Sequence, residues 1–136
     1  MSPGNSVSRA IGVLLDDQAI FDQAVNYYKS GAGNGALNQA IAFRHGAGLG
    51  QFQESGRDQD HNKLALGALA TFLEIAWNQG VDLYGHVGAG GRTFFDGTEY
   101  VARYNLGNSV PYTTYNNCDN VSQTSISSAG RGISRD

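Results

Sequence analysis

The side chains that could do chemistry are concentrated in residues 51–66, which have the sequence QFQESGRDQDHNKLAL. This segment combines amides, carboxylates, one guanidinium and one imidazole. An apolar run begins at Leu64, and its spacing predicts a buried helix. The polar side chains therefore lie at the N-terminal end of a buried helix, and such a position is common for a binding or catalytic site.

Two residues of this segment, His61 and Arg57, have a specific chemical interpretation. If Asp58 caps the helix, His61 falls in the first turn, where the positive end of the helix dipole disfavours imidazolium. A neutral imidazole can accept a proton near pH 7. Arg57 lies just outside the helix, and its planar guanidinium suits a carboxylate ligand. The amides of Gln53 and Gln59 suit sugar hydroxyls.

The same spacing also describes a helix-capping network, and on spacing alone we favour that interpretation. Asp58 would cap the helix, Arg57 would pair with Glu54 or Asp60, and His61 would pack. Hydrolysis by two carboxylates is a weaker alternative. The three acids lie so close in sequence that a pair facing across a cleft would need another acid elsewhere.

A second candidate group is the pair Tyr100 and Tyr104, which share one face of a predicted helix, with Arg103 beside Tyr104. Core aromatics whose hydroxyls reach a partner are the commoner reason for such a pair. The alternative is that one phenol faces a cleft and donates or accepts a proton. The residues themselves do not choose between the two tyrosines.

The elements that would position these groups are helices, so we predict an all-α fold of antiparallel helices. The apolar stripe of the central helix includes Leu66, Leu69, Leu73 and Trp77. Residues 31–51 are interpreted as loop, with a helical turn near 37–43 and the segment AFRHGAGLG in solvent. The tail, residues 108–136, is predicted to be largely irregular. The predicted helices are 6–15; 18–29, capped by Asp17; 62–78, capped by Asp58 or Asp60; and Thr93 or Asp96 to Leu106.

Length, composition and charge indicate a single domain and argue against several classes of protein. The 136 residues, 40% of them hydrophobic, suffice for one domain with a core. The net charge of −3 argues against a broad nucleic-acid surface, and no apolar run approaches the length of a membrane helix. The three histidines lack metal-ligand spacing, so no metal site is predicted.

Three segments carry a family resemblance: QESGRDQDHNKLALG, EIAWNQGVDLYG and EYVARYNLGNSVPY. They resemble the alginate lyase superfamily of polysaccharide lyases, and the likeness extends over roughly residues 3–132. The resemblance implies helical hairpins forming part of an (α/α) toroid. It also implies β-elimination on a 4-linked uronic acid polymer of the alginate or glucuronan type. An anionic polysaccharide partner, an extracellular location and no redox cofactor are implied as well.

The resemblance assigns roles to particular residues. Residues near the uronate carboxylate neutralise it, a base removes the C5 proton, and an acid protonates the departing O4. The Gly4-Asn5 pair looks like a family segment in which Trp stands where this chain has Ser6, which makes Asn5 a candidate neutraliser. Tyr104 is the first choice for the catalytic phenol. The implied catalytic residues are His61, Tyr104, Arg57 and Asn5, and the implied substrate-binding residues are Gln53, Gln59, Tyr100 and Arg103.

The chain is shorter than the usual catalytic domain of this superfamily. We therefore expect residues 1–136 to form a single partial domain. A non-catalytic remnant that binds carbohydrate or another partner is the alternative function. The sequence does not predict an oligomeric state.

Overall fold

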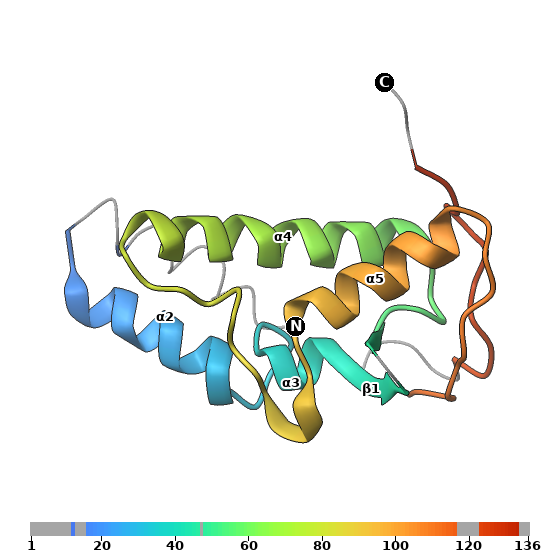
Figure 1. The fold of residues 1–136 in the computed structure, drawn as a ribbon, viewed down its shortest axis with the longest axis horizontal. Coiled ribbons are helices and arrows are strands. Elements are labelled where there is room, and N and C mark those ends of the chain that lie inside the picture. The colour runs from blue at the N-terminus through green and yellow to red at the C-terminus, as the bar shows by residue number, and fades with distance from the viewer. Residues whose placement is uncertain (1–11, 13–15, 47, 117–122, 134–136) are drawn as a thin grey trace.

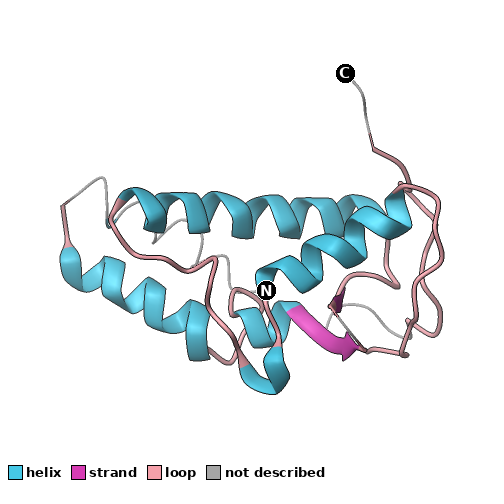
Figure 2. Ribbon diagram, in the orientation of Figure 1, coloured by secondary structure: helices cyan, strands magenta, loops and turns pink. Residues whose placement is uncertain are grey.

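The computed structural model describes residues 12, 16–46, 48–116 and 123–133. The long helix α4 spans the molecule, with α2 lying along one part of it and α5 along another (Figure 1). A β-hairpin follows the short helix α3 (Figure 2). The elements are α2 (Gln18–Ser30), α3 (Leu37–Ala40), β1 (Ile41–His45), β2 (Leu49–Phe52), α4 (Gln59–Asn78), the 3-10 turn η1 (Ala89–Gly91) and α5 (Phe94–Asn105).

The predicted all-α fold of helical hairpins within an (α/α) toroid is wrong, because the structure mixes helices with an antiparallel sheet. Strands β1 and β2 pair with Phe43 opposite Gln51 and His45 opposite Leu49. Gly46 and Gly48 form the connection with positive φ angles of 51° and 83°, which glycine adopts without strain. The segment interpreted as a solvated loop is therefore mostly strand, and its glycines make the turn.

Capping residues close in sequence determine where the helices begin and end. The Asp17 side chain accepts a hydrogen bond from the Ile20 N–H, which confirms the predicted cap of α2. Thr93 and Asp96 form a reciprocal capping box at the start of α5, and Gly107 has a φ of 99° just after its end. The predicted helix 6–15 falls outside the described residues apart from Gly12.

The central helix α4 begins one turn earlier than predicted and ends at the predicted residue. Leu69, Phe72, Leu73 and Ala76 are buried on it, which confirms the main apolar stripe. Trp77 is 55% exposed, so its predicted place on the buried face is wrong. It lies in the last turn of the helix, where its ring contacts Tyr84 in the following loop.

The hairpin is held against α5 by close backbone approach. A Cβ atom on Gly97 would collide with the Phe52 ring, and one on Gly50 would lie 2.9 Å from the Gly97 nitrogen. Both positions therefore need glycine for α5 to lie this close to β2. The packing fixes the loop that follows β2, and this loop leads directly into α4.

The described part of the C-terminal tail, residues 123–133, runs irregularly past the start of α4 and the end of α5 (Figure 1). We call these residues the C-terminal strap. Its backbone bonds to the β2–α4 connection, because Ser127 N–H donates to the Ser55 carbonyl and Gln59 N–H donates to the Ala129 carbonyl. No helix in the described part of the chain is long and apolar enough to cross a membrane.

Candidate functional site

A tight turn presents Arg57 and Asp58 at the start of α4. The backbone N–H groups of both residues donate to the Glu54 carbonyl, at 2.9 and 3.3 Å. Asp58 then adopts an extended conformation, and its side chain caps the helix by accepting from the His61 N–H at 2.7 Å. The cap brings Asp58 and His61 together because the third residue of a helix lies over its N-cap.

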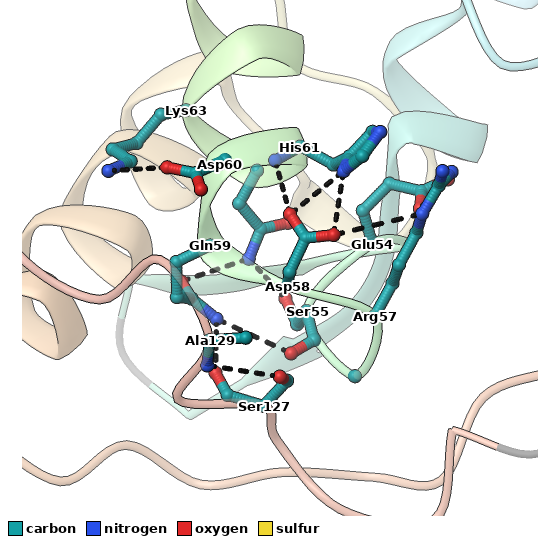
Figure 3. A network of polar contacts seen from close by, with 12 residues as sticks. Glu54, Ser55, Arg57, Asp58, Gln59, Asp60, His61, Lys63, Ser127 and Ala129 are labelled. Atoms are coloured by element: carbon teal, nitrogen blue, oxygen red, sulfur yellow. Dashed lines mark hydrogen bonds and ion pairs between the residues drawn. The ribbon is translucent and has the colours of Figure 1, made fainter.

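The Asp58 carboxylate also holds the His61 ring. Its oxygens lie 2.8 and 2.7 Å from Nδ1 (Figure 3). Partial burial acts to raise the Asp58 pKa, but the hydrogen bonds from His61 and the charges of His61 and Arg57 hold the pKa below its ordinary value. Asp58 is therefore ionised at neutral pH and can only accept, so Nδ1 carries the hydrogen and a neutral ring leaves Nε2 as acceptor.

Arg57 lies between two carboxylates. Its Nη1 donates to Glu54 Oε2 at 3.4 Å, and its Nε lies 3.8 Å from Asp58 Oδ2. Figure 3 shows the Glu54, Arg57 and His61 side chains gathered beside Asp58. The side chains of Arg57 and His61 are 32% and 38% exposed, so both are accessible to a ligand. The structure thus has the predicted capping and pairing, and it leaves both functional groups at the surface.

The amide of Gln59 is fully engaged inside the protein. Its Nε2 donates to the carbonyls of Ser55 and Ser127, and its Oε1 accepts from Asn62 and Asn105. These four bonds join the start of α4 to the preceding turn, to α5 and to the C-terminal strap. A sugar hydroxyl would have to displace one of them to reach this amide.

Gln53 is also buried, with 4% of the residue exposed. Its Oε1 has no hydrogen-bond partner among the described residues. Its backbone N–H donates to the Ala40 carbonyl, which continues the contact between the end of β2 and α3. The Gln53 side chain is therefore buried and is not presented at the surface as Arg57 and His61 are.

Tyr100 is completely buried on α5. Its hydroxyl donates to the Pro111 carbonyl at 2.8 Å, and its ring stacks on His45 with centroids 6.2 Å apart. Burial raises the Tyr100 pKa well above its ordinary value, and the nearby Tyr112 and Tyr104 phenols add to the rise. The Tyr100 hydroxyl is thus a protonated donor committed to a backbone carbonyl.

Tyr104 lies one turn further along α5 and is 8% exposed. The Arg131 guanidinium of the strap sits 4.1 Å from the centre of its ring, and Arg131 Nε donates to the Tyr104 carbonyl. Among the described residues, none forms a hydrogen bond with the Tyr104 hydroxyl. Neighbouring Arg103 is exposed and pairs with Glu99 at 2.6 Å.

The structure brings some of the predicted residues together. Arg57 and His61 share one cluster, and the bond from Asn105 to Gln59 ties the end of α5, which carries Tyr104, to the start of α4. Asn5 lies outside the described residues. Arg103 pairs only along its own helix among the described contacts.

The sequence did not predict the contacts of two residues, Arg131 and His45. Arg131 stands in a tail of small polar residues, and no sequence pattern connects it with Tyr104. His45 lies on β1, where its Nε2 is 2.9 Å from the buried Gln51 Oε1, and Gln51 in turn bonds to the Thr113 backbone. The alternation of Phe43 and His45 before a glycine turn was the available signal.

Within the described residues, no three His, Cys, Asp or Glu side chains gather as a metal-binding group. The carboxylates near His61 are instead paired with Arg57 and with the helix end. The site therefore presents one cation and one imidazole held by a carboxylate, which together suit an anionic ligand and a proton transfer.

The chain matches the family model described as alginate lyase over residues 8–111, which is more than half of its length. It therefore belongs to the alginate lyase family. The match confirms the resemblance carried by the three sequence segments and places the chain among polysaccharide lyases. No curated protein matches the chain, and no solved structure matches it.

Proposed function

We propose that this protein cleaves a 4-linked uronic acid polymer, of the alginate or glucuronan type, by β-elimination. One observation carries the proposal: Asp58 holds His61 through Nδ1, and Nε2, which has no hydrogen bond to any described residue, can accept a proton next to an accessible guanidinium. Membership of the alginate lyase family supplies the class of substrate. We further propose that the protein acts outside the cell, where such polymers occur.

In this proposal Arg57 binds the uronate carboxylate. Among the described residues, the ion pairs of Arg57 join its Nη1 to Glu54 and its Nε to Asp58, and its side chain is 32% exposed, so the planar fork can also donate to the substrate. Neutralising the charge of the carboxylate acidifies the neighbouring C5 proton. The negative charge that develops when this proton is removed is delocalised onto the carboxylate, where a positive partner stabilises it. Asn5 is proposed as a second donor to the same carboxylate.

The proton transfers are assigned to His61 and Tyr104. His61 Nε2 accepts the C5 proton, the electron pair forms the C4–C5 double bond, and the C4–O4 bond breaks. The Tyr104 phenol donates its proton to the departing O4. Asp58 acts as a positioning residue that fixes the orientation and tautomer of the His61 ring.

Substrate contacts beyond these residues are also proposed. Arg103 is exposed enough to pair with a further uronate along the polymer, at the expense of its contact with Glu99. For Gln53, Gln59 and Tyr100 we propose an indirect part, in which their buried side chains support the elements that carry the proposed site.

The test is incubation with alginate and with glucuronan while the ultraviolet absorbance of unsaturated uronic ends is followed. Cleavage by the native chain, lost in His61→Ala with unchanged circular dichroism, is the expected result. A folded protein that produces no unsaturated ends from either polymer would refute the proposal.

The second candidate function is a carbohydrate-binding or interaction module without catalysis. It is favoured by the strap, which covers the Tyr104 ring with Arg131, and by the two carboxylates already paired with Arg57. Sugar binding measured by calorimetry, together with a flat absorbance trace, would support this candidate instead.

A further inference from the structure

A pocket with a different character lies at the opposite end of α4 from His61. Trp77 stands sixteen residues beyond His61, which is roughly 24 Å along a helix. The pocket measures about 500 Å³. Its lining consists of three aromatic side chains, two carboxylates and a glycine: Trp77, Tyr84, Phe95, Glu74, Asp82 and Gly85.

The three rings form a continuous wall. Tyr84 stands in the middle, with its centroid 6.4 Å from that of Trp77 in an edge-on arrangement and 6.3 Å from that of Phe95 in a stacked one. Trp77 and Phe95 are 55% and 59% exposed, so much of each side chain is accessible to a ligand. The pocket is therefore bordered by aromatic surface on which a cation can be attracted to the negatively polarised face of a ring.

The two acids of the pocket have no cationic partner in the described part of the chain. No lysine or arginine in the described part of the chain forms an ion pair with Glu74 or Asp82. One oxygen of each carboxylate is fixed by a neutral donor: the Tyr84 hydroxyl donates to Glu74 at 3.1 Å, and the Gly85 N–H donates to Asp82 at 3.1 Å. The second oxygen of each has no hydrogen-bond partner among the described residues.

We propose that this pocket binds a small organic cation, namely an ammonium group with methyl or other alkyl substituents. Aromatic faces attract such cations through their quadrupoles and contact the alkyl groups, while the two carboxylates supply the opposite charge. The same carboxylates repel a polyuronate. The pocket is thus separate in place and in charge preference from the surface around Arg57.

The chain contains a built-in reporter, because Trp77 is its one tryptophan. The experiment titrates the native protein with choline and, in parallel, with dimethylbutanol, the neutral isostere in which carbon replaces the nitrogen. Saturable quenching of Trp77 fluorescence by choline in the millimolar range is expected. At least about fivefold weaker binding is expected for the alcohol, because only the cation gains the electrostatic contributions.

A charge-removing variant tests the carboxylates while keeping their structural bonds. Glu74→Gln with Asp82→Asn retains an acceptor oxygen for the Tyr84 hydroxyl and for the Gly85 N–H. Choline binding should weaken by at least about fivefold in this double variant. The matched control is Asp22→Asn with Glu99→Gln, which removes two charges from exposed sites on α2 and α5 and should bind choline like the native chain.

The comparison of choline with its isostere uses the native chain, so it stands even if the double variant does not fold. Equal quenching by choline and the alcohol would overturn the proposal. So would choline binding that survives in a folded double variant. Concentration-dependent self-association that is lost in Phe95→Ser, with no choline response, would also overturn it and make the pocket a contact between copies of the chain.

Discussion

Substitution of Asp58 by asparagine separates the two tasks of this side chain. Asparagine is as good an N-cap as aspartate, so the bond to the His61 N–H is retained. The charge that holds the His61 ring through Nδ1 is lost. The amide that replaces the carboxylate can also offer an N–H to the ring, which favours the wrong tautomer for a base that acts through Nε2.

The expected change in stability is small. The substitution removes the attraction between the carboxylate and the helix dipole, about 0.3–1 kcal/mol. It also removes the contact with Arg57 at 3.8 Å, which at a partly exposed site is worth about 0–1 kcal/mol. The free energy of unfolding should therefore fall by about 0.3–2 kcal/mol, and the protein should remain folded.

The expected change in activity is larger. Removing the carboxylate partner of a buried catalytic histidine lowers kcat by about 10⁴ in serine proteases. Asp58 is 22% exposed, so water can replace part of its effect. We expect kcat to fall by about 10²-fold, a difference of about 2.7 kcal/mol in the activation barrier. KM should change little, because Arg57 still binds the substrate carboxylate.

The assay follows unsaturated uronic ends over a range of polymer concentrations, so that kcat and KM are obtained separately. Asp17→Asn is the matched control, because Asp17 caps α2 through the Ile20 N–H at 3.1 Å, far along the chain from His61. It should lose similar stability and no activity. Full kcat in folded Asp58→Asn, or an equal fall in Asp17→Asn, would refute the positioning role.

Four further predictions concern the same surface. Tyr104→Phe should abolish elimination and leave polymer affinity nearly unchanged, measured by calorimetry, because only the phenolic proton is lost; full activity would make Tyr104 structural. Arg57→Lys should weaken polymer binding about tenfold, since a point charge replaces a fork, and unchanged affinity would restrict Arg57 to pairing at the helix start. Arg131→Ala should lower the free energy of unfolding in urea by about 0.5–1 kcal/mol through loss of the contact with Tyr104, which an unchanged midpoint would contradict. Asp58 stabilises the fold above its ordinary pKa of 3.8 and loses this effect as pH falls through its lower folded value, so Asp58→Asn should show a smaller loss of stability in acid than the native chain.

The predictable parts of the molecule are those decided by neighbouring residues. Asp17, Thr93 and Gly107 mark helix ends because caps act within one turn. The cluster of Arg57, Asp58 and His61 was foreseeable for the same reason, since it spans little more than one turn. The structure confirms the cap, and the functional interpretation stays a prediction that uses the same arrangement, because the capping carboxylate also holds the His61 ring.

The hairpin was missed because distant residues decide it. The alternation before Gly46 is short, and the glycines that follow it suggested a loop. Pairing becomes favourable when β2 lies against α5, where Gly97 allows contact with Phe52. The prediction that Trp77 is buried was wrong for a related reason. Helical periodicity assigns a residue to a face of the helix, but the neighbours of a residue in the last turn come from the following loop.

The C-terminal strap joins α4 to α5, and sequence periodicity does not predict this role. Its small polar residues bury little, yet the strap contacts both elements that carry the proposed site. Gln59 and Lys63 on α4 bond to strap carbonyls, while Arg131 and Gly132 bond to the Tyr104 carbonyl and the Asn105 side chain on α5. The relative position of His61 and Tyr104 therefore depends on hydrogen bonds from α4 and α5 to a segment without apolar periodicity. The part-buried bonds of this network specify geometry, because a donor or acceptor that lost its partner there would be left partly desolvated.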